Sequence, residues 1–295
     1  MKPVRVITGN PGATADILAR HIAAQLNERW GRPVIVDNRG GAAGTISAEI
    51  AAHALPDGYT LLMGQLNSHA LAVSLHRKLS YDPLTDFAPI TRVALAPLLF
   101  VVNSSMPTNS WRELADYARQ RPGQIDYASA GNGTTSHLTA ELFKQAAGLD
   151  LLHIPYKGGG AAIRAVMSAE VKTGFVALAS AWPILKSGKI RALAIASRQR
   201  FPTLPDVPTL DEGGLPKFES TTWFGMFAPA HTGKALVARL NRDIVEILRT
   251  PSVRQDLLKQ GAEPAPGTPE EFTAFIKSEI VKWRDVIKTA GIQPQ

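Results

Sequence analysis

Four short segments rich in glycine, serine and threonine are the candidates for binding chemistry: residues 8–14, 64–69, 129–136 and 156–160. Each follows an apolar run and precedes a pattern typical of a helix. The first amides of a helix have no intrahelical acceptor and carry partial positive charge, and small side chains let a ligand approach them closely. Together the segments predict an anion site built mainly from backbone amides, although any one of them is also typical of an ordinary strand-to-helix connection.

Motifs for catalysis or metal binding are absent from the sequence. It contains no cysteine, no phosphate-binding loop of the form G-x-x-x-x-G-K-[ST], no G-x-S-x-G nucleophile and no H-E-x-x-H helix. Its seven histidines show no spacing typical of metal ligands. We therefore expect no enzymatic activity, no cofactor and no metal.

Several conspicuous residues favour structural roles instead. Asp57 is expected to form a turn, Asn38 and Arg39 to fix a loop, and Trp223 to pack in a core. Lys157, next to the fourth segment, is expected to be solvated rather than paired with a ligand.

Length and composition indicate a globular protein of two domains. The chain has 295 residues, of which 45% are apolar and 19% charged, enough apolar mass for real cores. The net charge is +7, but the basic residues are scattered and lack interleaved aromatic residues, so we expect no binding to nucleic acid. The longest uncharged apolar run, residues 93–102, falls far short of the roughly 20 residues that a membrane-spanning helix needs.

The order of apolar patterns predicts an α/β fold with two lobes. Strands are expected at residues 4–7, 33–36 and 59–63, with helices between them, and the same alternation returns with strands at 97–102, 125–129, 152–154, 171–176 and 190–195. This order favours two mostly parallel sheets flanked by helices. A strand at 222–229 could return to the first sheet.

These elements imply a discontinuous first lobe of residues 1–100 and 225–295 and a second lobe of residues 101–224, joined by a hinge. Ligands of open α/β sheets bind at the carboxyl ends of the strands. We therefore expect the ligand cleft between the lobes, with two of the four segments contributed by each, and closure of the lobes over the ligand.

Five stretches resemble, in their order along the chain, the Bug family of extracytoplasmic solute-binding receptors of tripartite tricarboxylate transporters. They are PGATADILAR at 11–20, VDNRGGAAG at 36–44, PDGYTL at 56–61, YASAGNG at 127–133 and HIPYKG at 153–158. The resemblance covers nearly the whole chain. It implies a periplasmic-binding-protein-like fold, capture of a small carboxylate (an organic, amino or aromatic acid) and delivery to membrane permease subunits. It also implies a periplasmic location, with the signal peptide removed, and we expect a monomer.

Carried over position by position, the resemblance implies a set of ligand-binding residues in both lobes. They are Asn10, Pro11, Gly12, Ala13, Thr14, Gly64, Gln65, Asn67, Ser68, His69, Ser129, Gly131, Asn132, Gly133, Thr134, Thr135, Ser136, Tyr156, Gly158 and Val176. A bulky residue at Gly133 is expected to block binding with little effect on melting temperature. The chain departs from the family pattern at Ala13, where a glycine is usual, and at Lys172, which is expected to reverse a charge near the cleft.

Two other functions remain open at this point. A sensor that presents a bound acid to a membrane signalling protein would share the fold. An α/β enzyme acting on an acid is the weaker alternative, because it should show a nucleophile or base.

Overall fold

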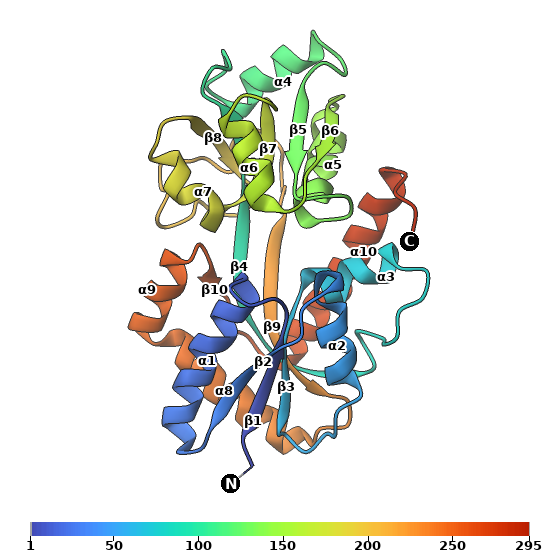
Figure 1. The fold of residues 1–295 in the computed structure, drawn as a ribbon, viewed down its shortest axis with the longest axis vertical. Coiled ribbons are helices and arrows are strands. Elements are labelled where there is room, and N and C mark those ends of the chain that lie inside the picture. The colour runs from blue at the N-terminus through green and yellow to red at the C-terminus, as the bar shows by residue number, and fades with distance from the viewer. Residues whose placement is uncertain (1, 295) are drawn as a thin grey trace. The chain divides into compact units, whose positions relative to one another are not determined.

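The computed structural model describes residues 2–294, which divide into two compact units (Figure 1). Unit 1 contains the residues up to Leu95 and those from Trp223 onward, and unit 2 is Ala96–Thr222. The chain passes between the units within two strands, β4 (Phe87–Asn103) and β9 (Thr221–Pro229). Within the described range, no helix has both the length and the apolar character to cross a membrane.

Unit 1 begins with a β-α-β-α-β motif. Its elements are β1 (Val4–Thr8), α1 (Thr14–Trp30), β2 (Val34–Asn38), α2 (Thr45–Ala52), preceded by a 3-10 turn at Ala42–Gly44, and β3 (Thr60–Gln65). The strand β1 lies between β2 and β3, and all three are parallel. The helix α1 ends at Gly31, whose φ of 60° suits glycine.

The rest of unit 1 adds antiparallel strands and helices. The strand β9 pairs with β3, and the short β10 (Glu263–Pro264) pairs with β4. The helices are a π-helical turn at Asn67–Leu71, α3 (Ala72–Leu75), α8 (Lys234–Arg249), α9 (Pro251–Lys259) and α10 (Pro269–Thr289). The helix α10 starts with a capping box between Thr268 and Glu271, as a T-x-x-E sequence favours.

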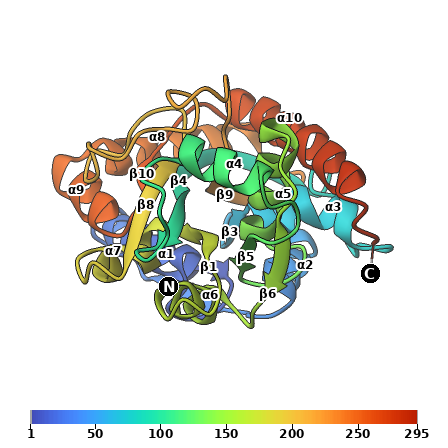
Figure 2. The ribbon, with the colours of Figure 1, turned by 90° about the horizontal axis from the view of Figure 1, so that it is seen from above.

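Unit 2 repeats the motif of unit 1. Its elements are β5 (Asp126–Ser129), α5 (Thr135–Ala147), β6 (Leu152–Pro155), α6 (Gly159–Met167) and β7 (Thr173–Ala177). The first strand, β5, again lies between the other two and parallel to both. Because the two crossovers run in opposite directions and crossovers are right-handed, α5 and α6 cover opposite faces of β5 (Figure 2).

The remaining elements of unit 2 are α4 (Trp111–Arg119), α7 (Leu178–Leu185) and β8 (Ile190–Ile195). Both β7 and β8 pair antiparallel with β4. The expected parallel arrangement therefore holds for β5, β6 and β7, and β4 and β8 depart from it. An apolar core centred on Phe100, Phe143 and Phe175 joins these elements.

Two glycines face one another across β3 and β9 and make room for aromatic rings in unit 1. Gly64 pairs with Gly225 in the strand register. A side chain at Gly64 would place a Cβ 2.7 Å from both His69 Cε1 and Phe227 Cε2, and one at Gly225 would overlap the ring of Phe272. The ring centroids of Phe227 and Phe272 are 5.1 Å apart. These packed aromatic rings fill the space that side chains at the two glycines would occupy.

We expect Gly225→Ala to lower the free energy of unfolding by about 1–3 kcal/mol, because overpacking displaces buried rings. Chemical denaturation measures this loss. Gly9→Ala is the matched control, since a Cβ there would meet nothing within 4 Å, and its effect should stay within about 0.5 kcal/mol. Equal stability of the two variants would contradict this packing account.

Candidate ligand-binding site

The turn between β1 and α1 presents the start of a helix that no side chain caps. Its N-cap residue, Ala13, has extended backbone angles (φ −74°, ψ 160°) and no side chain that could accept an amide proton. The preceding Gly12 has a φ of 75° and donates its amide to Asp16 Oδ2 at 2.8 Å. Residues 10–13 are exposed, and the partial positive charge at the start of α1 favours an anion beside them.

The turn between β5 and α5 in unit 2 has the same construction. Its N-cap residue, Thr134, has the same angles (φ −74°, ψ 160°), and its side chain does not cap α5. The preceding Gly133 has a φ of 71° and donates its amide to His137 Nδ1 at 3.1 Å. The Thr134 hydroxyl instead bonds the carbonyl of Gly131 at 2.7 Å.

Each unit therefore presents one uncapped helix start at the carboxyl end of its central strand. In each, a left-handed glycine precedes the N-cap, and the third helical residue accepts that glycine's amide proton. The two turns occupy equivalent places in the repeated β-α-β-α-β motif. Neither 10–14 nor 129–136 contains a lysine or arginine, so the positive potential comes from backbone amides.

In unit 1, a network around Asp16 holds the turn. Asp16 is buried and accepts hydrogen bonds from Gly12, from Arg20 at 3.1 Å and from Asn38 Nδ2 at 2.8 Å. Desolvation raises the pKa of Asp16, but these hydrogen bonds outweigh it and leave the pKa below 3.8. Asn38 also bonds the carbonyl of Gly9 at 3.0 Å, which confirms its expected role in fixing a loop.

In unit 2, a stack of rings holds the equivalent turn. His137 stacks on His153 with centroids 3.9 Å apart, and His153 stacks on Tyr127 at 4.8 Å. His153 Nε2 lies 2.6 Å from Ser129 Oγ, which accepts the amide of Gly131 at 3.1 Å. Since His137 and His153 both contact loop residues 129–133, their charge state affects the loop.

Burial keeps both histidines neutral. Desolvation, reinforced by His137, lowers the pKa of His153 to about 4. Desolvation also lowers the pKa of His137, although Glu141 opposes the shift. Glu141 itself has a lowered pKa: burial raises it, but hydrogen bonds from Tyr127 at 2.6 Å and Lys144 at 2.9 Å outweigh burial. A neutral His137 can accept the Gly133 amide, whereas a protonated one cannot.

The fourth segment is joined to the third. Tyr156 donates its amide to Ser129 O at 3.0 Å, and Gly158 donates its amide to Ala130 O at 3.1 Å. The Tyr156 hydroxyl bonds Glu170 at 2.7 Å. Gly158 is exposed with a φ of 96°, and Lys157 is exposed as expected.

The second segment differs from its expected form as a loop. Gly64 and Gln65 end β3, and the residues from Asn67 form a π-helical turn. Ser68 and His69 are buried, and desolvation lowers the pKa of His69 to about 3. The His69 ring stacks on Phe227 at 4.1 Å. The room left by Gly64 and Gly225 lets the His69 ring pack against Phe227, which places residues 67–71 in a buried helical turn instead of an open loop.

Three further expectations are corrected. Val176 is buried in β7, opposite Leu99 of β4, rather than exposed like residues 10–13. Lys172 lies at the amino end of β7, where its ammonium is 3.3 Å from Asp126 Oδ2, at the edge of the parallel strands opposite residues 129–136. The left-handed Gly133 would be strained by any larger residue, so Gly133→Leu would also lower the melting temperature.

The residues that position the turns escaped the sequence analysis. The network of Asp16 depends on Asn38, which is distant in the sequence, and the ring stack of His137 and His153 depends on contacts between separate elements. The sequence does contain one signal that both turns share: Gly12 precedes Asp16 by four residues, and Gly133 precedes His137 by four. That spacing is typical of the third helical residue accepting the amide that precedes the N-cap.

The two units, each with a β-α-β-α-β motif, have the α/β fold class of the solved periplasmic binding protein described below. Within that class, the model for the tripartite tricarboxylate transporter family receptor matches residues 18–292, and the chain belongs to this family. The family consists of periplasmic solute-binding receptors and not of enzymes. The predicted resemblance to the Bug family and the predicted fold class are confirmed.

Three similar solved structures illustrate the family. Rpa4515 of R. palustris, solved with adipate, is 37% identical over 99% of this chain and 98% of that one, with a TM-score of 0.86. The periplasmic binding protein BugD is 35% identical over 99% of both chains, with a TM-score of 0.81. MatC from Rhodopseudomonas palustris, with bound malate, is 34% identical over 97% of this chain and 98% of that one, with a TM-score of 0.79.

We expect the free energy of unfolding to fall as the pH drops from about 6.5 towards the pKa of about 4 of His153. The unfolded chain binds a proton in that window and the folded one does not, so acid favours unfolding. After allowance for solvent screening, His153 should contribute about 1–2 kcal/mol. Denaturation of His153→Gln across this window should therefore show a shallower pH dependence than the native chain.

His53→Gln is the control, because His53 is exposed at the end of α2. It should keep the native slope. A His153→Gln slope equal to the native one would show that the ring stack does not couple protonation to stability.

Proposed function

We propose that this receptor captures a small dicarboxylate in the periplasm and delivers it to the membrane permease subunits of a tripartite tricarboxylate-type transporter. One observation carries the proposal: each unit contributes an equivalent uncapped helix start, at residues 12–16 and 133–137. Each such start suits a carboxylate. The relatives solved with adipate and malate hold acids of this kind.

The recognition follows from backbone chemistry. Hydrogen bonds to an anion are about twice as strong as neutral ones, and helix starts add favourable dipole energy. Several such bonds suffice for micromolar affinity, roughly −8 kcal/mol. Specificity for a carboxylate would then come from the shape of the turns, which Asp16 and the His137–His153 stack hold.

In each unit, the proposed contacts lie at the carboxyl end of the central strand, β1 or β5. The segments 10–14, 129–136 and 156–158 provide the contacts, and Gln65 and Asn67 are the half-exposed members of the second segment. The crossing strands β4 and β9 would serve as the hinge for closure over the ligand.

Calorimetric titration with adipate and malate should show binding, and the neutral analogue adipamide should bind at least about tenfold more weakly, equivalent to 1.4 kcal/mol. The recovered acid should be unaltered. Ala13→Leu should weaken adipate binding by a similar factor, because a bulky residue would cover the first amides of α1. Its extended backbone tolerates leucine, so the melting temperature should not change.

Ala235→Leu is the matched control, since Ala235 is exposed in the first turn of α8. It should bind adipate as the native chain does. The proposal fails if adipamide binds as well as adipate, if the acid is converted to a product, or if Ala13→Leu binds normally.

A further inference from the structure

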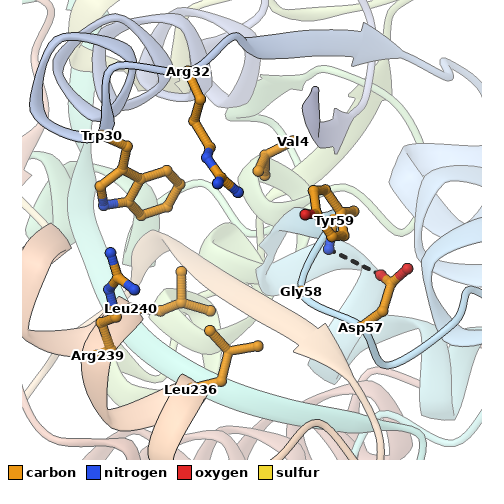
Figure 3. Close-up of a pocket in the computed structure, with 9 residues that line it drawn as sticks. All are labelled: Val4, Trp30, Arg32, Asp57, Gly58, Tyr59, Leu236, Arg239 and Leu240. Atoms are coloured by element: carbon orange, nitrogen blue, oxygen red, sulfur yellow. Dashed lines mark hydrogen bonds between the residues drawn. The ribbon is translucent and has the colours of Figure 1, made fainter. Parts of the chain in front are cut away.

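A cavity lies within unit 1, at the edge of its sheet opposite the turn at residues 10–14. It has a volume of about 210 Å³ and is lined by Val4, Trp30, Arg32, Asp57, Gly58, Tyr59, Leu236, Arg239 and Leu240 (Figure 3). Its residues come from the amino ends of β1 and β3, the end of α1 and the first half of α8. The five residues of β1 separate this cavity from the turn at 10–14, which is roughly 16 Å at 3.3 Å per residue.

The cavity has apolar walls and a cationic rim. Trp30 and Tyr59 lie on opposite sides of it, Leu236 and Leu240 line one edge, and the guanidinium of Arg32 points into the space between the two rings (Figure 3). The volume lies below the roughly 300 Å³ typical of drug-sized ligands. It therefore suits a small molecule with one ring or a short alkyl chain.

The two arginines of the cavity lack strong counter-ions. Arg32 makes no ion pair with the described residues and lies 6.0 Å from the centre of the Tyr59 ring. Arg239 approaches Asp243 at 3.9 Å only. Asp243 is already hydrogen-bonded by Trp30 Nε1 at 2.8 Å and is also approached by Arg29 at 3.4 Å and Arg242 at 3.8 Å.

Asp57, the acidic residue that lines the cavity, does not neutralise the charge of the two arginines. The Asp57 carboxylate accepts hydrogen bonds from the Lys2 ammonium at 2.8 Å and from the Tyr59 amide at 2.9 Å. The Lys2 contact, followed by that amide, lowers the pKa of Asp57, so it stays ionised and paired. A ligand carboxylate would supply the missing negative charge between Arg32 and Arg239, where a guanidinium can bind it through two hydrogen bonds.

We propose that this cavity is a second binding site, for a small monocarboxylate with an aromatic or aliphatic body. The body packs between Trp30 and Tyr59 against the leucines of α8, and the carboxylate meets Arg32 and Arg239. This site is separate from the proposed transport site and uses side-chain cations, whereas the transport site uses backbone amides.

The test uses benzoate as the probe and the indole N–H signal of Trp30 as the readout in two-dimensional NMR. Benzoate should shift this signal saturably, and benzyl alcohol, which has the same ring without the charge, should shift it at least about tenfold less effectively. Arg32→Gln and Arg239→Gln should each weaken the benzoate effect about tenfold or more. Arg242→Gln is the matched control on α8, because Arg242 does not line the cavity, and it should behave as the native chain.

The variant Ala13→Leu separates this proposal from the proposed function, since it alters only the turn at the other edge of the sheet. Benzoate should shift Trp30 equally in this variant. The proposal is overturned if benzyl alcohol acts as strongly as benzoate, if neither arginine variant reduces the effect, or if Arg242→Gln or Ala13→Leu abolishes it.

Discussion

The amide groups at the start of a helix need an acceptor, and at the turns that follow β1 and β5 the side chain of the N-cap residue does not provide one. The N-cap residues of α1 and α5 have the same backbone angles, and neither side chain caps its helix. In each case a glycine with left-handed backbone angles precedes the N-cap residue. The open amides are therefore a consequence of local backbone geometry, repeated once in each unit.

The two turns are held by different chemistry. In unit 1 an ionised Asp16, bonded to Arg20 and Asn38, accepts the glycine amide. In unit 2 a neutral His137, stacked on His153, does so. The charge of Asp16 is neutralised by Arg20, and the histidines are kept uncharged by burial, so neither support repels a bound carboxylate strongly. As the pH falls, the turn in unit 2 loses its support first. His153 has a pKa of about 4, whereas the pKa of Asp16 lies below 3.8.

Much of the architecture could be predicted from local patterns. Apolar runs at residues 4–7 and 125–129, each followed by a glycine-rich segment and a helical period, indicated the strands and helices that carry the turns. Lys172 and Val176 show the limit of such reasoning. Lys172 lies at the end of β7 away from the turns, whereas Val176 lies at the near end but is buried beside Leu99 of β4. Both placements are decided by pairing between distant strands. The burial of His69 likewise depends on Gly64 and Gly225 lying opposite each other, which no local pattern reveals.

The central claim is that backbone amides at the start of a helix hold the carboxylate of the ligand. A crystal structure of the adipate complex tests it most directly. The account predicts that a carboxylate of adipate accepts amide protons from residues 14–16 or from residues 135–137, with N···O distances of about 2.7–3.2 Å. A complex in which lysine or arginine side chains alone bind both carboxylates would contradict it.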